Sequence, residues 1–299
     1  MSTLATHRPA TDGAPALPSH TAPPSPSPAV KARTTAPGWL GRAAATAGAW
    51  AWKSAAIALF LALWEFGPTY LASASTRVFL PPRHEVLAAG ADPVRTGQLQ
   101  NHLLASITRS AAGFGIAVVL GVALGLVIAW YRPLNSFLNP LLELFHNTAA
   151  LALLPVFTLL LGIGEESKIT IVAYAAFFPV LLNTVAGVRT VDQLLVRAAK
   201  SLGLNSFSLF QKVILPSAVP TIFTGIRMGG TASILVLIAA EMVGAKAGLG
   251  YLIINAQSSF LIPQMYAGIL AVSLLGLLVN TALVAAERHF SRWRVAITA

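Results

Sequence analysis

The sequence predicts an all-α membrane protein with about six transmembrane helices. Of the 299 residues, 56% are hydrophobic and only 10% are charged, and the mean hydropathy is +0.71. Soluble domains carry roughly 25% charged residues, so this composition excludes an ordinary soluble protein. The apolar residues are also gathered into segments near the ~20 residues that a helix needs to cross a bilayer.

Six apolar segments are predicted to cross the membrane. They run approximately over 54–71, 106–131, 138–161, 169–188, 217–243 and 262–286. The second contains Gly121 and Gly125 and the fifth Gly225 and Gly229, a four-residue spacing that allows helices to approach closely. Glu65 lies in the first segment, and we expect it near the outer end or inside the bundle because a lipid-facing acid is costly.

A polar stretch over 189–216 separates the fourth and fifth segments and is predicted to form two short amphipathic helices. Thr190 and Gln193 have the spacing of a capping box, and Gly203 stands where a helix takes a left-handed C-terminal residue. Apolar residues then recur at helical spacing on one face. These are Leu194, Leu195, Ala198, Ala199 and Leu202.

The second short helix is expected to begin at Asn205 or Ser206, either of which can cap it, and to end at Pro216. Leu209, Phe210, Val213 and Ile214 form its apolar face. Both helices are too polar to cross a membrane. A structured segment of this kind between two spans predicts a docking site for another protein, the alternative being an ordinary amphipathic linker.

Lys and Arg residues set the predicted orientation, since they concentrate in cytoplasmic loops. With the N-terminus inside, the inner segments hold thirteen and the outer segments five. The outer five are Arg77, Arg83, Arg95, Lys168 and Lys246. Both termini and the 189–216 segment are therefore predicted to lie in the cytoplasm.

The remaining features exclude other classes. Residues 1–38 are rich in Pro, Ser, Thr and Ala and are predicted to be a disordered arm, so the membrane domain is predicted over 39–299. The chain has no cysteine, and its six His show no metal-ligand spacing. The net charge of +10 lies in short loops and forms no basic face for nucleic acid. No phosphate-binding Gly-x4-Gly-Lys-Ser/Thr loop is present, and no nucleophile–base pair suggests catalysis.

The 189–216 segment resembles the cytoplasmic "EAA" loop of ABC-importer permeases. The resemblance rests on Ala198-Ala199, on Gly203 four residues later, and on Ile214-Leu215-Pro216. Where the family motif usually begins with Glu, this chain has Arg197. Further similar motifs extend over about residues 55–294, and they are most similar to the sulfonate, taurine and nitrate permeases. They are Phe79–Leu87, Leu153–Phe157, Gly162–Ile169, Phe177–Thr184, Ala240-Glu241, Gly248–Tyr251 and Glu287–Trp293.

This resemblance implies a type I ABC-importer permease fold and the import of a small solute across the bacterial cytoplasmic membrane. It implies that two separate ATPase subunits bind and hydrolyse ATP, and that an extracytoplasmic binding protein delivers the solute. A six-helix subunit is about half of a pathway, which favours a homodimer. The residues implied to contact the ATPase are Arg197, Ala198, Ala199, Gly203, Leu209, Phe210 and Pro216.

Three polar residues inside the spans are candidates for the translocation path, and each has an ordinary alternative. Asn183 could open the fourth span to water or hydrogen-bond within the bundle. Arg227 could attract an anion or extend to the cytoplasmic surface. Glu241 could act as a path acid or pair with a neighbour. His146 with Asn147 is expected to be a satisfied polar pair between helices.

Other functions stay open at this point. The solute could instead be a small heterocyclic precursor. An ion-gradient-driven transporter predicts paired broken helices in an inverted repeat, and no such symmetry is visible. A membrane-embedded enzyme predicts clustered His or acids within the spans, whereas Glu65, His146 and Glu241 are isolated in the sequence.

Overall fold

The computed structural model describes residues 39–70 and 78–290, and within these ranges it is helical, with no strand. The predicted arm over 1–38 lies outside the described residues. The chain divides into two compact units, Met1–Ala56 and Ile57–Ala299, and the side-chain contacts discussed below lie within the second. The α-helices are α1 (Trp39–Tyr70), α3 (Arg83–Arg95), α4 (Gln98–Trp130), α5 (Arg132–Asn147), α6 (Leu154–Leu161), α7 (Glu165–Arg189), α8 (Gln193–Ser201), α9 (Ser206–Leu209), α10 (Leu215–Met242), α11 (Leu249–Ser258) and α12 (Ile262–Phe290).

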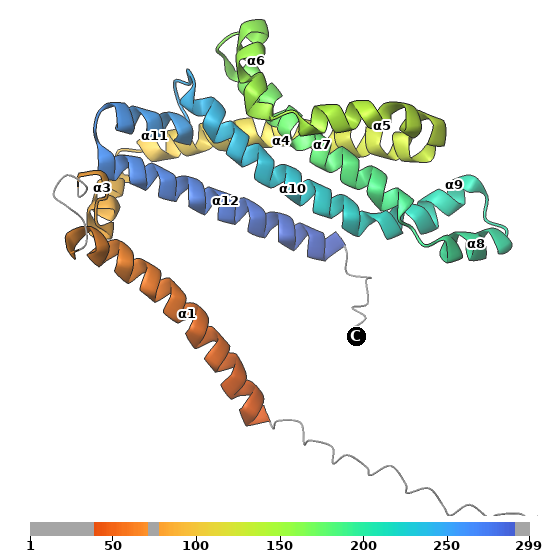
Figure 1. Ribbon diagram of the computed structural model, residues 1–299, viewed down its shortest axis with the longest axis horizontal. Coiled ribbons are helices and arrows are strands. Elements are labelled where there is room, and N and C mark those ends of the chain that lie inside the picture. Colours follow the sequence, from red (N-terminus) through yellow and green to blue (C-terminus); the bar gives the residue numbers. More distant parts are fainter. Residues whose placement is uncertain (1–38, 71–77, 291–299) are drawn as a thin grey trace, which may run out of the picture. The chain divides into compact units, whose positions relative to one another are not determined.

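Helix α7 is the centre of the fold, because α4 and α10 both pack along it (Figure 1). Glycines make these approaches close. A Cβ on Gly121 or Gly125 of α4 would lie 2.9 Å or less from a side-chain atom of α7, and Gly225 and Gly229 of α10 meet α7 in the same way. The predicted close approach at both glycine pairs is confirmed.

Four helices within the described ranges are long and apolar enough to cross a membrane. They span Gln98–Trp130, Glu165–Arg189, Ser206–Met242 and Ile262–Phe290. The first predicted segment corresponds to the shorter apolar stretch Ser54–Pro68 within α1. Near the end of this stretch, Glu65 Oε1 lies 2.7 Å from His84 Nδ1 of α3.

The third predicted segment is broken rather than straight. Pro133–Asn147 and Ala150–Leu161 pass as one span only together, and they are bent by 84°. The chain between them is extended at Thr148 and Ala149, and a 3-10 turn, η1 (Ala150–Leu153), precedes α6. Because the whole segment is apolar, its composition gave no sign of this break. Pro155 lies in the first turn of α6, where a helix readily takes a proline.

The second amphipathic helix does not end at Pro216, so that prediction was wrong. From Ser206 the chain stays helical to Met242, through a π-helical turn, η2 (Phe210–Ile214), that leads into α10. Proline lacks the N–H that an α-helix needs at this point, and a π turn changes the hydrogen-bond register locally. The hydroxyl of Ser217 donates to the carbonyl of Val213 at 2.7 Å within the same stretch.

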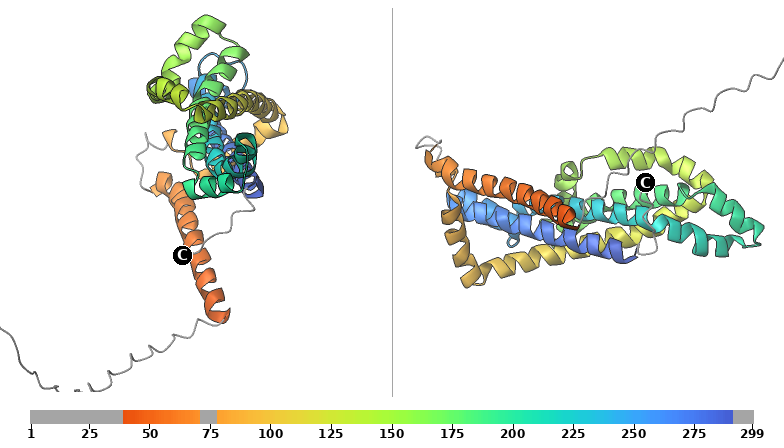
Figure 2. Two further views of the ribbon diagram at one scale, coloured as in Figure 1. Left: turned by 90° about the vertical axis from the view of Figure 1, so that its right-hand side faces the viewer. Right: turned by 90° about the horizontal axis from the view of Figure 1, so that it is seen from below.

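Both ends of this unit carry structure outside the long helices. Figures 1 and 2 place α8 and α9 at one end and α11 at the other. Two apolar cores lie between them. The core toward the α11 end centres on Leu154, Ile171, Val172, Leu237 and Ala240, and the core toward the α8 end on Ile128, Ala129, Leu181 and Val185.

Candidate functional site

The first helix of the 189–216 segment is held by caps at both ends. Asp192 is its N-cap and accepts a hydrogen bond from Leu194 N at 2.8 Å. The predicted capping box is therefore wrong, because the Thr190 hydroxyl donates backward to the carbonyl of Ala186. Aspartate is as good a cap as threonine, and it stands directly before the helix.

Gly203 has the backbone that the sequence predicted. Its φ is +78°, its N–H donates to the carbonyl of Lys200, and Leu204 N donates to the carbonyl of Ala199. These two bonds form a Schellman motif. A residue other than glycine would be strained there by about 1–2 kcal/mol. Asn205 then caps α9 by accepting from Ser208 N at 2.8 Å.

The apolar side chains of this segment divide into buried anchors and exposed contacts. Ala199 and Leu209 are buried against the bundle, and Phe210 packs edge-on against Trp130 of α4 with ring centroids 5.0 Å apart. Leu194 and Leu202 are 73% and 81% exposed. Leu195 and Phe207 are exposed as well. Surface leucines of a lone domain are not usually grouped so densely, and such groups mark interaction sites.

The remaining predicted docking residues lie in the same region. Arg197 and Ala198 are exposed on α8, and Pro216 is half-buried in the first turn of α10. A cavity of about 620 Å³ opens between α8 and the ends of α4 and α7. Arg189 and Lys200 lie among its lining residues.

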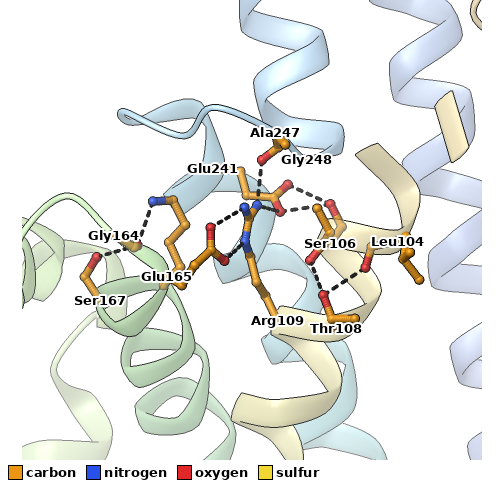
Figure 3. Close-up of polar contacts among 12 residues, drawn as sticks. Leu104, Ser106, Thr108, Arg109, Gly164, Glu165, Ser167, Glu241, Ala247 and Gly248 are labelled. Atoms are coloured by element: carbon orange, nitrogen blue, oxygen red, sulfur yellow. Dashed lines mark hydrogen bonds and ion pairs between the residues drawn. The ribbon is translucent and has the colours of Figure 1, made fainter. Parts of the chain in front are cut away.

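The three candidates for the translocation path differ in their burial and in their hydrogen-bond partners. Asn183 of α7 is half-buried and donates to the carbonyl of Pro179 at 2.8 Å. Arg227 of α10 is 43% exposed, and its Nη1 lies 3.5 Å from Glu287 Oε2 of α12. Glu241 has no exposed surface. It lies in a buried polar network at the α11 end, shown in Figure 3.

This network, which we call the arginine cluster, comprises Ser106 and Arg109 of α4, Glu165 of α7 and Glu241 of α10. Arg109 Nη1 donates to Glu241 Oε1 at 2.8 Å, and the Ser106 hydroxyl lies 2.9 Å from both oxygens of Glu241. On its other side, Arg109 forms a two-pronged ion pair with Glu165, through Nε to Oε2 and through Nη2 to Oε1. One guanidinium, itself 5% exposed, thus joins three helices.

The arginine cluster also fixes the loop between α10 and α11. Arg109 Nη1 donates to the carbonyl of Ala247, Gly250 N donates to Glu241 Oε2 at 3.0 Å, and Leu249 N donates to the Ser106 hydroxyl oxygen at 2.9 Å. Gly248 has φ +129°, and a Cβ there would collide with the Glu241 carboxylate. His102 Nδ1 accepts from Gly248 N at 3.1 Å.

A charge buried this deeply is tolerated only when its partners satisfy it. Glu241 has three donors, Ser106, Arg109 and Gly250 N, and its burial favours a structural role over contact with a solute in this conformation. The sequence did not single out Arg109 or Ser106. The available signal was Arg109, an arginine inside an apolar span, with Ser106 three residues earlier. An arginine in such a position needs a carboxylate partner within the bundle. In the described part of the chain, no group of three or more His, Asp or Glu could hold a metal ion.

The family profile described as "Binding-protein-dependent transport system inner membrane component" matches residues 117–295. That range takes in α8, Gly203, the π turn and Glu241. The chain belongs to this permease family. The predicted family and its all-α membrane fold are thereby confirmed.

Relatives of this permease carry the names of the predicted subgroup. The taurine transport system permease TauC of Escherichia coli is 35% identical over 72% of this chain and 80% of its own length. A putative aliphatic sulfonates permease, SsuC of Bacillus subtilis, is 33% identical over 79% of this chain and 85% of its own. The nitrate import permease NrtB of a Synechocystis strain is 34% identical over 60% of this chain and 65% of its own.

Among solved structures, the inward-facing MetNI methionine ABC transporter has a similar chain. The TM-score is 0.53 at 16% identity, covering 64% of this permease and 95% of that chain. At this identity the likeness concerns the fold. The family profile and the named relatives together identify the protein as a membrane-spanning ABC-importer permease with a role in transport.

Proposed function

We propose that this permease is the membrane subunit of an ATP-driven importer for a small solute such as taurine, an aliphatic sulfonate or nitrate. Two copies form the pathway, and two separate ATPase subunits hydrolyse ATP. A binding protein delivers the solute to the extracytoplasmic face. The family membership and the names of the relatives support the general assignment.

The single observation that carries the ATPase contact is the exposed apolar surface of α8 and α9. Leu194, Leu202 and Phe207 are each at least 73% exposed on a segment whose backbone is fixed by Asp192 and Gly203. A surface that is apolar and preorganised binds a partner with little ordering cost. We assign the ATPase contact to this surface, with Arg197 and Ala198 on it and with Ala199, Leu209, Phe210 and Pro216 holding it in place.

The proposed placement has residues 1–38 as a cytoplasmic arm, residues 39–299 as the permease domain, and the 189–216 segment in the cytoplasm. The Lys and Arg distribution supports this orientation. Under it, the α11 end and the arginine cluster face the side from which the binding protein delivers. Asn183 and Arg227 remain candidates for the path because both keep some exposed surface.

The test is co-purification of the ATPase from the native membrane, with a matched pair of glycine variants. Gly203 and Gly162 have φ +78° and +80°, and neither has an atom within 4 Å of its Cβ position. Valine strains the backbone at both sites, and more at Gly162, whose ψ is 172°, so Gly162→Val is a strict control for general strain. We expect Gly203→Val to lose the ATPase and Gly162→Val, located in the turn before α7, to retain it.

Loss of the ATPase in both variants would point to general misfolding of the permease and against a specific contact at α8. Retention in both would exclude Gly203 from the contact. An unaltered permease that brings down no ATPase would contradict the importer assignment itself, and uptake driven by ion gradients would then be measured.

A further inference from the structure

Helix α5 has three faces, and only one of them is used by the fold. Leu134, Leu138 and Leu142 pack into the core beside α7. A second face is apolar and exposed, with Phe137, Leu141 and Leu144 at 79%, 54% and 65% exposure. The third face is polar over about a third of the helix circumference at 100° per residue. It consists of Asn135, Ser136, Asn139, Glu143, His146 and Asn147.

The contacts of α5 with α7 show how far this polar face extends along the bundle. At one end, with the Asn135 amide oriented so that its oxygen faces the guanidinium, Asn135 accepts from Arg189 Nη1 at 2.8 Å. At the other end, the Tyr174 hydroxyl donates to the carbonyl of Phe145 at 2.9 Å. Residues 174 and 189 of α7 are about 22 Å apart along the helix.

Residues 135 and 145 of α5 are about 15 Å apart along their own helix. Since α7 is itself a span, α5 therefore enters about half of the ~30 Å hydrocarbon layer and does not lie on the membrane surface. Glu143 stands two turns from Asn135, about 12 Å deeper. A carboxylate at that depth costs several kcal/mol against lipid, so polar residues there face a bundle interior or an aqueous cavity. Asn139, Glu143, His146 and Asn147 are exposed in the single subunit.

We propose that the polar face of α5 lines the solute path and that the Glu143 carboxylate selects solutes carrying an ammonium or N–H donor. This inference rests on the proposed function, in which two copies surround the path. The apolar face with Phe137 and Leu144 then meets lipid. One exposed face of α5 then contacts water in the path, and the other contacts lipid.

The contacts on this face specify its chemistry. Asn139 Nδ2 donates to Glu143 Oε1 at 2.7 Å, and Asn147 Nδ2 donates to the Glu143 backbone carbonyl at 2.9 Å. Asn139 holds the carboxylate in place and leaves Glu143 Oε2 for a donor from the solute. Among the described side chains of this face, from Asn135 to Asn147, Glu143 is the only charged one besides His146, so this part of the face repels a bare oxyanion such as nitrate and favours an aminosulfonate zwitterion or a heterocyclic N–H.

The absence of cysteine from the sequence makes accessibility directly measurable, because each introduced thiol is the only one. We would label Asn139→Cys and Asn147→Cys with a charged, membrane-impermeant methanethiosulfonate in vesicles that contain the whole complex. Phe137→Cys and Leu144→Cys on the same helix are the matched controls. Because the reactive thiolate forms only where water reaches, we expect the polar positions to react at least about tenfold faster. Equal rates on both faces, or no labelling on the polar face, would overturn the proposal.

The selectivity step uses Asn147→Cys, which leaves the hydrogen bond from Asn139 to the Glu143 carboxylate intact. We would measure its protection by taurine, by ethanesulfonate, which lacks the ammonium, and by nitrate. We expect protection by taurine at concentrations about tenfold lower than by the other two, as a charged hydrogen bond contributes. Adding Glu143→Gln should abolish this difference, because it removes both the attraction for the taurine ammonium and the repulsion of ethanesulfonate and nitrate. Equal protection by the three solutes before that change would contradict selection by Glu143.

ATPase recovered from the same vesicles separates the two hypotheses. An intact complex with an unreactive polar face would refute the role of α5 while leaving the importer standing. A reactive polar face in a permease that binds no ATPase would refute the importer assignment and leave an aqueous path along α5.

Discussion

The two ends of this permease use polar and apolar residues in opposite ways. At the α11 end, the arginine cluster buries the charged groups of Arg109 and Glu241 and pairs them with each other, and the exposed Glu165 pairs with the same arginine. At the α8 end, leucine and phenylalanine side chains are exposed, and the polar groups of Asp192 and Asn205 serve only to cap helices. The first end is complete within one chain. Under the proposed function, the second end is complete only with the ATPase.

The largest expected effect comes from removing the arginine that completes the first end. Arg109→Leu leaves the Glu241 carboxylate buried without its cation, which we expect to lower the free energy of unfolding by about 3–5 kcal/mol. Thermal unfolding in detergent measures this loss. Arg227→Leu is the control, because the Arg227–Glu287 pair is longer and partly exposed, and its removal should change stability by less than about 1 kcal/mol.

A second substitution tests whether charge or packing is responsible. Adding Glu241→Gln to Arg109→Leu removes the unpaired charge while preserving the shape of the side chain. We expect the double variant to be more stable than Arg109→Leu alone. If it is less stable, the loss in the single variant reflects packing around the arginine and the contrast between the two ends weakens.

An intermediate effect is expected where the loop closes over Glu241. Gly248→Ala introduces a Cβ against the carboxylate at φ +129° and should destabilise the permease by about 2–3 kcal/mol. Gly162→Ala, at φ +80° and ψ 172° in open space, carries the backbone strain without the collision and should therefore cost less. Unfolding of the two variants side by side isolates the collision, and equal losses would show that Glu241 moves aside freely.

The smallest effect on the permease alone is expected at the second end. Leu202 is 81% exposed, so Leu202→Ser should change its stability by no more than about 0.5 kcal/mol. The same change should weaken ATPase binding about tenfold, because an exposed leucine that becomes buried in an interface contributes roughly 1.5 kcal/mol or more. Binding to the purified ATPase by titration measures this, with Leu159→Ser on α6, 86% exposed, as the control.

The same contrast explains what the sequence could predict. The 189–216 segment is local: caps, helical spacing and Gly203 all lie within 28 residues, and its two helices and the left-handed glycine are confirmed. The errors there are also local. Thr190 and Asp192 are both acceptable caps, and the π turn that accommodates Pro216 leaves no signature in a single sequence.

The arginine cluster could not be predicted in the same way. Arg109 and Glu241 are 132 positions apart, and their contact depends on how α4, α7 and α10 pack together. The sequence indicated that each charge in a span needs a partner but not which one. The break between α5 and α6 was missed for a related reason. Hydropathy shows how apolar a segment is, but it does not show whether the helix axis changes direction within that segment.

The π turn gives the continuous helix Ser206–Met242 a further meaning. A helix of 37 residues is about 55 Å long, and it begins on the exposed apolar segment and ends beside Glu241. Because the chain stays helical across Pro216 and Pro220, we expect a tilt imposed at Phe207 to be transmitted to the opposite end instead of being absorbed by a loop. Gly225 and Gly229 contact α7 near the middle of this 37-residue helix, and we expect the helix to pivot at that contact.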